Sequence, residues 1–385
     1  MSVKSEQRQK YQLDFLASGE NIIVGNENNL PLPLGEILKI TKEDGPVEKY
    51  FSGGLTAEVF KLKIGESSYT LKKKRSQILV GNVDGQTSFL NEVQRRRDFE
   101  ELKKINRDKY SGIVDTIYAN LNCGVILSKW IEGREIEKYD RDIIDSIFYN
   151  LYNMEIGGVF ECDPSNGNLL LTENNKVVMF DFGYAYPFDY LTDFNADGLE
   201  EPLFHLAERF ETRCFFQLLL DIEKTLGIDK ALSLFKIEKE IALKYYSLKL
   251  ESVIKNNGIN IIIKYLEYFI NLWRECMNNN DKLSNLYSLD LFRSFLLDVH
   301  DDLSGKSCTP DTLEKINEVI DIAKNNYDFI KSQNVLFFGD EKLGKKNLLD
   351  KYENYRTDVI RYQLKELYGF NLWKKNRIDK IKKNY

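Results

Sequence analysis

The stretch that decides the fold reads Phe160-Glu161-Cys162-Asp163-Pro164-Ser165-Asn166-Gly167-Asn168-Leu169-Leu170-Leu171, and it is followed by Val177-Val178-Met179-Phe180-Asp181-Phe182-Gly183. Each piece contains a short apolar, strand-like run, and a polar turn at residues 173–176 separates the two runs. A turn between strands would explain the Pro, Asn and Gly after Asp163, but not the Asp-Phe-Gly that ends the second run. Each motif alone is common by chance. Their separation by thirteen residues, from Asn168 to Asp181, makes the combination far more specific.

The composition describes a globular chain and excludes several classes of function. The 385 residues are 43% hydrophobic and 12% aromatic, which is ample for a core, and the net charge of −6 gives no support to a nucleic-acid partner. Five scattered cysteines favour a reducing compartment over a disulfide framework or a zinc site, and two histidines are too few for a His-based site. We find no transmembrane segment of about 20 apolar residues. We therefore expect a cytoplasmic protein, or a secreted effector without a conventional signal peptide.

Upstream, residues 46–75 have the pattern of three strands joined by turns. The first turn, Ser52–Ala57, carries small residues at Ser52, Gly54 and Ala57, so backbone N–H groups there could approach a phosphate. Such a turn is usually only a turn. In the third strand Lys72 shares a face with Thr70.

The next segments continue the pattern. Residues 86–106 are helical by apolar periodicity, with Glu92 about one turn in. Two further strands are expected at Ile113–Tyr118 and Cys123–Ile131, and an amphipathic helix at Asp140–Ile156 precedes the opening stretch. By itself, Glu92 would be an exposed helical glutamate beside arginines.

These motifs, in this order, resemble the protein-kinase-like superfamily. The resemblance implies an α+β, two-lobed fold with a small antiparallel β lobe, a large α-helical lobe and a helical C-terminal extension. It implies four regions: a lead at 1–45 packing on the small lobe, the small lobe at 46–131, the large lobe with the catalytic loop at 132–245, and the extension at 246–385. The apolar patch of the lead, Leu32–Ile40, is expected to be an extra strand or a strap.

The resemblance also implies a role for each motif. Lys72 would be the nucleotide-binding lysine and Glu92 its ion-pair partner, with Glu100 as the fallback. Ser128 would be the gatekeeper residue beside the hinge between the lobes. The remaining nucleotide-binding residues would come from the small-residue turn and the strand after it, from the position two residues before the lysine, and from the hinge. They are Ser52, Gly53, Gly54, Ala57, Val59, Thr70, Lys129, Trp130 and Ile131.

The implied chemistry is transfer of the γ-phosphoryl group of ATP to a hydroxyl, and each residue type suits its role. Asp163 would orient the acceptor hydroxyl and accept its proton. Asn168 and Asp181 offer the hard oxygen ligands that Mg²⁺ prefers. The implied cofactors are therefore ATP and Mg²⁺, and the implied partner is a hydroxyl-bearing substrate.

Two departures from typical protein kinases leave the acceptor open. Glu161-Cys162 stand where His-Arg would precede the catalytic Asp, and no Ala-Pro-Glu follows Asp181. The divergence resembles the aminoglycoside-phosphotransferase, choline-kinase, RIO and lipopolysaccharide-kinase-like branches, so a protein Ser/Thr and a small molecule or sugar stay open as acceptors. A catalytically inactive pseudokinase, acting as a nucleotide-binding interaction module, is the alternative function.

The rest of the chain is expected to be mostly helical. Arg209, Glu211 and Arg213 would pair with the catalytic loop or with each other, and Thr309-Pro310 marks a helix start. The extension would bind the acceptor or brace the lobe. Residues 339–346 nearly match a nucleotide P-loop, but Lys346 replaces the Mg²⁺-binding Ser or Thr, so we interpret them as a polar turn. The basic tail, 374–383, would be a frayed, solvated helix end or would contact an anionic partner or a membrane surface.

Overall fold

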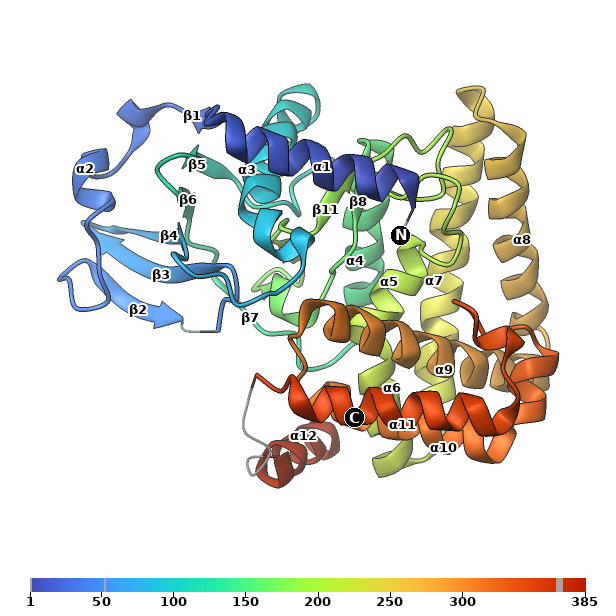
Figure 1. Ribbon diagram of the computed structural model, residues 1–385. Helices are drawn as coiled ribbons and strands as arrows, with labels where there is room; N and C mark the ends of the chain where they lie inside the picture. The colour runs from blue at the N-terminus through green and yellow to red at the C-terminus, as the bar shows by residue number, and fades with distance from the viewer. Residues whose placement is uncertain (1, 52, 365–369) are drawn as a thin grey trace. The chain divides into compact units, whose positions relative to one another are not determined.

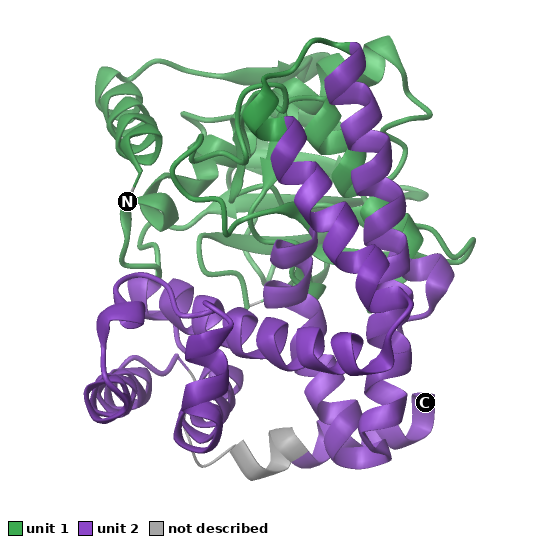
Figure 2. Cartoon of the chain, turned by 90° about the vertical axis from the view of Figure 1, so that its right-hand side faces the viewer, with its two compact units in different colours: residues 1–136, 145–206, 256–262 green, residues 137–144, 207–255, 263–385 purple. Residues whose placement is uncertain are grey.

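The chain divides into two compact units, and each is described by itself. The computed structural model describes residues 2–51, 53–364 and 370–385. The first unit comprises residues 1–136, 145–206 and 256–262, and the second comprises 137–144, 207–255 and 263–385 (Figure 2). Ser52, which we assigned to the small-residue turn, lies outside the described residues. The other predicted site residues all belong to the first unit.

The first unit is built on a six-stranded antiparallel sheet with the strand order β1-β5-β6-β4-β3-β2 (Figure 1). Its strands are β1 (Ile23–Gly25), β2 (Val47–Phe51), β3 (Ala57–Ile64), β4 (Ser67–Lys74), β5 (Thr116–Asn120) and β6 (Val125–Lys129). Five of the six lie where strands were predicted. The strand expected from Ile113 begins only at Thr116, because Ile113 forms a parallel bridge with Met179 instead.

The N-terminal lead supplies the sixth strand and two helices. Its elements are α1 (Val3–Ser18), β1, the 3₁₀ turn η1 (Glu27–Asn29) and α2 (Leu34–Ile37). The apolar patch Leu32–Ile40 is therefore not a strand. Ile37 and Ile40 are buried in one hydrophobic cluster with Phe60 and Leu71 of the sheet, so the patch covers the sheet as a strap.

Helix α3 (Val83–Ile105) and the opening stretch complete the part of the first unit that matters for the site. The stretch forms β8 (Val159–Glu161), the 3₁₀ turn η2 (Asn166–Asn168), β9 (Leu169–Thr172), β10 (Val177–Met179) and β11 (Ala185–Pro187). Strands β9 and β10 form a hairpin, to which β7 (Gly133–Arg134) adds, and β11 pairs with β8. These two pairings return the Asp-Phe-Gly segment to the side of the catalytic-loop segment, with the Phe180 N–H donating to the Asn168 carbonyl at 3.3 Å.

The second unit is helical. Helix α4 (Arg141–Ile156) has its first residues in this unit, and the remaining elements are α5 (Leu206–Phe210), the π-helical turn η3 (Glu211–Phe215), α6 (Phe216–Leu226), α7 (Ile228–Lys255), α8 (Asn260–Met277), α9 (Asn280–Gly305), α10 (Pro310–Ser332), the 3₁₀ turn η4 (Asp340–Lys342), α11 (Lys345–Arg361) and α12 (Phe370–Asn384). Helix α10 starts as predicted, with Thr309 as the cap and Pro310 as the first helical residue. Residues 339–346 form the 3₁₀ turn and the first residues of α11.

Charged residues of α5 and η3 find partners that the sequence did not suggest. Arg209 pairs with Asp301 at 3.0 Å, and Arg213 pairs with Asp298. Both acids lie on α9. Glu211 is fully buried and pairs with Lys239 of α7 and, at 2.9 Å, with Arg293 of α9. These ion pairs join three elements of the second unit through its core.

The basic tail is not a frayed end. Helix α12 brings the Arg377 guanidinium to three acids, pairing it with Asp221 of α6 at 2.6 Å, Asp311 of α10 at 2.5 Å and Glu314. The Tyr385 hydroxyl also accepts a hydrogen bond from the Tyr139 N–H at 2.6 Å. The tail is a helix and not a frayed end because distant acidic residues, which the local sequence cannot reveal, bind one of its cations, while Lys375, Lys380, Lys382 and Lys383 are exposed to solvent as expected.

Substituting Lys239 by Met is expected to destabilise the protein by about 3–5 kcal/mol, because it leaves buried carboxylates short of a cation. Lys239 is 1% exposed and pairs with both Glu211 and Asp290, the latter at 3.2 Å. Urea unfolding monitored by circular dichroism measures the loss. The matched control is Lys230→Met on the exposed start of the same helix, which we expect to change the free energy of unfolding by no more than about 0.5 kcal/mol. Equal stabilities of the two variants would contradict the assignment.

The fold class was predicted correctly: a small antiparallel sheet and a large helical region make an α+β protein. The four predicted regions stay a prediction. Among the described residues, no helix combines the length and the apolar character needed to cross a membrane.

Candidate active site

Lys72 projects from β4, which lies between β3 and β6 in the sheet. The side chain is almost fully buried, with the residue only 4% exposed. Its Nζ lies 2.8 Å from Glu92 Oε1 and 2.8 Å from Asp181 Oδ2. A buried ammonium is tolerated only with such partners, and here the two acids come from separate parts of the sequence.

Glu92 lies on α3 and is buried beside a second cation. Arg96, one turn further along the helix, donates from Nη2 to the same Oε1 atom at 2.9 Å. Glu92 is therefore not the exposed glutamate that the helical pattern alone allowed. The fallback, Glu100, contacts Lys103 at 3.2 Å and accepts the Thr116 N–H at 2.9 Å.

Asp163 and Asn168 are joined directly. Asn168, at the end of η2, donates from Nδ2 to the Asp163 carbonyl at 3.0 Å and to its Oδ2 at 3.3 Å. The Asp163 N–H in turn donates to Glu161 Oε1 at 2.8 Å. These bonds fix the direction of the Asp163 carboxylate. They also point the side-chain oxygen of Asn168, Oδ1, away from Asp163.

Asp181 follows β10 and is held in its ionised form. Removal from water opposes ionisation, but the charge and hydrogen bond of Lys72, the Gly183 N–H at 3.2 Å from Oδ1 and the charge of Arg96 outweigh it, so the pKa of Asp181 lies below its usual value. The Asp181 side chain is 37% exposed. The next residue, Phe182, is fully buried against Phe99 of α3, with ring centroids 4.6 Å apart.

The small-residue turn keeps its shape through Gly54. A Cβ on Gly54 would lie 2.3 Å from the Ala57 carbonyl oxygen, so no larger residue fits there without a shift of the backbone. Its own carbonyl accepts a hydrogen bond from Arg75 Nε at 2.8 Å. Gly53 and Val59 lie beside it in the same turn and strand.

The predicted hinge is placed next to β4, but one of its backbone donors is already used. The Trp130 N–H donates to the Ser68 carbonyl at 3.0 Å, so an adenine ring would have to use other backbone groups of residues 129–131. Thr70 of β4 pairs with Ser128, which is buried. A cavity of about 290 Å³ borders residues 129–131, but Lys103, Arg107, Tyr110 and Asp115 are among its other lining residues, whereas Lys72, Asp163 and Asp181 are not.

Glu161 was quoted in the sequence but given no role, and the structure places it under the catalytic loop. It is 5% exposed, its Oε1 accepts the Asp163 N–H, and Oε2 has no hydrogen-bond partner among the described residues. Burial, followed by the nearby charges of Asp163, Asp181 and Glu92, raises the pKa of Glu161 well above its usual value. Burial therefore favours the neutral form of the carboxyl that accepts the Asp163 N–H.

This raised pKa makes stability depend on pH with a definite sign. Stabilisation from neutral Glu161 is fully present below the unfolded-state pKa of about 4.3 and is lost as the pH rises toward the folded-state pKa. In Glu161→Gln the side-chain carbonyl can still accept the Asp163 N–H. The free-energy cost of ionising a buried carboxyl at higher pH is absent, because an amide does not titrate. We expect the free energy of unfolding of this variant, relative to the wild type, to rise between pH 5 and pH 8 by up to about 1.4 kcal/mol per pH unit. Urea unfolding at the two pH values, with the exposed Glu27→Gln as control, checks this. A difference independent of pH would show that Glu161 is ionised.

Residues 82–209 match the family model of the ABC1 atypical kinase-like domain. The chain carries a protein-kinase-like domain. The matched part of the kinase-like domain runs from the start of α3, through Asp163, Asn168 and Asp181, to Arg209, and Lys72 lies upstream of it.

The individual matches are distant. Protein ACTIVITY OF BC1 COMPLEX KINASE 3, chloroplastic, from Arabidopsis thaliana is 30% identical over 105 residues, which are 24% of this chain. The chain spans about 15% of the length of this relative. The structure of Rv3197 from Mycobacterium tuberculosis in complex with erythromycin aligns with 59% of this chain and 63% of that chain, at 13% identity and a TM-score of 0.29.

The predicted site residues thus fall into two groups by their contacts. Lys72 with Glu92 and Asp181, and Asp163 with Asn168, are linked by side-chain hydrogen bonds within one unit. Among the residues that the structure describes, Val59 pairs with Lys72 and Lys129 pairs with Tyr69 in the sheet, and the hinge and turn positions are given no side-chain hydrogen bond to these five residues. Three further residues, Glu161, Asn91 and Arg96, were not predicted to belong to the site. All three are buried and polar. Glu161 binds a backbone N–H, and Asn91 and Arg96 bind backbone carbonyls that lie far away in the chain.

Proposed function

We propose that the protein is an ATP- and Mg²⁺-dependent phosphotransferase that moves the γ-phosphoryl group to a hydroxyl. The observation that carries the proposal is the Lys72 ammonium, which lies 2.8 Å from both Glu92 and Asp181 in the same unit as the bonded pair Asp163 and Asn168. Phosphoryl transfer depends mainly on positioning and charge neutralisation, and this arrangement offers a cation, two oxygen ligands for a metal and a carboxylate.

The donor set fits Mg²⁺. Among the described residues no cluster of three His, Cys, Asp or Glu side chains could hold a metal, but Mg²⁺ bound with nucleotide usually takes only one or two carboxylates from the protein and the rest from phosphates and water. Asp181, ionised and partly exposed, and the Asn168 amide oxygen would hold it. The metal would neutralise charge on the phosphates.

The chain's own groups would do the remaining work. Lys72, fixed by Glu92, would bind the phosphates once the nucleotide separates it from Asp181. Asp163 would orient the acceptor hydroxyl and take its proton, and its direction is set by Asn168 and by the Glu161 carboxyl under its backbone. Glu161-Cys162 in place of His-Arg means that no arginine precedes Asp163 to receive an activating phosphate. The acceptor is a protein Ser/Thr or a small molecule or sugar.

Calorimetric titration with ATP, in the presence and absence of Mg²⁺, tests the first half of the proposal, and ADP release in the presence of candidate acceptors tests the second. We expect Mg²⁺-dependent binding followed by acceptor-dependent ADP formation. Binding without any turnover would favour the pseudokinase alternative, and failure to bind nucleotide would exclude both functions.

A further inference from the structure

Two buried polar side chains of α3 bind the backbone on both sides of Asp181. We propose that Asn91 and Arg96 are positioning residues that fasten the Asp-Phe-Gly loop to α3 and hold Asp181 beside Lys72. The contacts stand independently, and their meaning for catalysis rests on the proposed function.

Asn91 binds the loop after Asp181. Its Nδ2 donates to three carbonyl oxygens, those of Phe182 at 3.2 Å, Gly183 at 3.0 Å and Ala185 at 2.7 Å. The side chain is 1% exposed, so no water competes for these bonds. The amide has two N–H hydrogens to share among these three carbonyls, and the Phe182 carbonyl also accepts the Ala185 N–H at 3.2 Å. Loss of Asn91 would therefore remove a buried donor mainly from the Gly183 and Ala185 carbonyls, which is costly inside a protein.

Arg96 binds the loop before Asp181. Its Nη2 donates to the Phe180 carbonyl at 2.6 Å and to Glu92 at 2.9 Å, and Nη1 donates to the Ser128 hydroxyl at 3.1 Å. The residue is 2% exposed, and its guanidinium lies 5.2 Å from the centroid of the Phe182 ring. One planar group therefore links the partner of Lys72, the predicted gatekeeper and the loop that carries Asp181, a geometry that the rigid fork of Arg allows and Lys does not.

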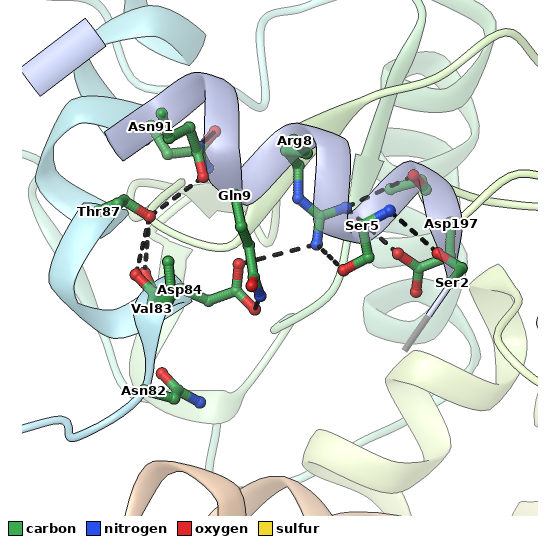
Figure 3. A network of polar contacts seen from close by, with 12 residues as sticks. Ser2, Ser5, Arg8, Gln9, Asn82, Val83, Asp84, Thr87, Asn91 and Asp197 are labelled. Carbon is green, nitrogen blue, oxygen red and sulfur yellow. Dashed lines mark hydrogen bonds and ion pairs between the residues drawn. The ribbon is translucent and has the colours of Figure 1, made fainter. Parts of the chain in front are cut away.

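Helix α1 sets the orientation of Asn91 from the other side. Gln12 of α1 donates from Nε2 to Asn91 Oδ1 at 3.4 Å and accepts the Thr87 hydroxyl at 3.1 Å, which leaves the Asn91 NH₂ facing the loop. Figure 3 shows α1 beside the first turns of α3, with Arg8 and Gln9 directed toward Asp84.

The same helix also contacts the chain beyond the loop. Arg8 donates to Asp197 at 3.3 Å (Figure 3). Its guanidinium also lies 3.9 Å from the centroid of the Tyr186 ring. Helix α1 is thus joined both to α3 and to the segment that follows Asp181. It supports the fastened loop from outside.

These bonds explain how the site is ordered without a phosphorylated activation loop. Asp181 is held between two anchors on the same helix that carries Glu92, so Lys72, Glu92 and Asp181 move as one group. Loss of either anchor would free the loop while the rest of the sheet and α3 keep their own hydrogen bonds.

Hydrogen–deuterium exchange on the full-length protein tests this inference directly. The amides to follow are Gly183, bonded to Asp181 Oδ1, and Ala185, bonded to the Phe182 carbonyl. In Asn91→Leu we expect both to exchange at least about tenfold faster, while amides of β4 and β6 are unchanged. The matched control is Asn195→Leu, since Asn195 is also 1% exposed and donates to two backbone carbonyls at 2.7 and 2.8 Å, but outside this loop.

Arg96→Lys is the second variant, and it keeps the buried positive charge in case Asn91→Leu does not fold. A single ammonium cannot reach Glu92, Ser128 and Phe180 together, so Gly183 should again exchange faster, by a smaller factor. Wild-type exchange rates in a folded Asn91→Leu or Arg96→Lys protein would overturn the inference. This readout does not require turnover, so it holds even if the protein transfers no phosphate. If transfer is observed, we expect both variants to lower kcat more than they raise the KM for ATP.

Discussion

Replacing Asp163 by Asn is expected to lower the rate of phosphoryl transfer by a factor of about 10²–10⁴, the usual contribution of a positioned proton acceptor. Asn is nearly isosteric, and Asn168 can still donate to the carbonyl of residue 163, so the loop should keep its shape. Affinity for Mg²⁺ and ATP should change little, because Asp163 is not among the groups assigned to the nucleotide. Initial rates of ADP formation at saturating acceptor, together with calorimetry, measure the two effects separately.

The control for this substitution is Asp14→Asn, the same chemical change on the exposed face of α1, where Asp14 pairs with Lys10 at 2.6 Å. Its rate should equal that of the wild type. A variant at Asp163 with unchanged turnover would remove this residue from the reaction.

The second large effect is expected from Asp181→Asn. The amide keeps the volume of the side chain but loses the charge that a metal requires, so the affinity for ATP should become independent of Mg²⁺, and transfer should fall by on the order of 10³. The fold should tolerate the change, because Lys72 keeps its bond to Glu92 at 2.8 Å. Calorimetric titration with ATP over a range of Mg²⁺ concentrations gives the linkage directly.

For this prediction the informative comparison is Asp193→Asn, a change at another acid of the same unit that pairs with Lys4 of α1. It should leave the Mg²⁺ dependence of binding intact. If Asp181→Asn bound nucleotide with the wild-type dependence on Mg²⁺, the metal would have to be held elsewhere.

The local part of the site could be predicted from the sequence because its contacts are short in sequence or follow a simple period. Asn168 reaches Asp163 across five residues, and alternation along one strand selected Lys72 over its basic neighbours. Glu92 was the first glutamate on the next helix in the order that the resemblance required. For these residues, the spacing and order of the motifs were sufficient to predict which side chains lie together.

The parts that could not be predicted depend on long-range partners. Asn91 and Arg96 are polar residues on a helix that was predicted from its apolar pattern. That pattern does not indicate their carbonyl partners, which lie 91 residues from Asn91 and 84 residues from Arg96. Helix α1 has a polar sequence, and its contacts include Asp84 and Asp197, which lie far along the chain. Arg377 is a similar case in the second unit, where a basic stretch supplies a partly buried cation to distant acids.

Phosphorus NMR of ATP mixed with the protein, Mg²⁺ and candidate hydroxyl acceptors tests the central claim most directly. We expect the γ-phosphorus signal to decline only when Mg²⁺ is present and a phosphate monoester signal to grow in its place. In Asp163→Asn both changes should be slower by a factor of about 10²–10⁴. A γ-phosphorus signal that stays intact although ATP is bound, with protein and small-molecule acceptors both present, would contradict the claim.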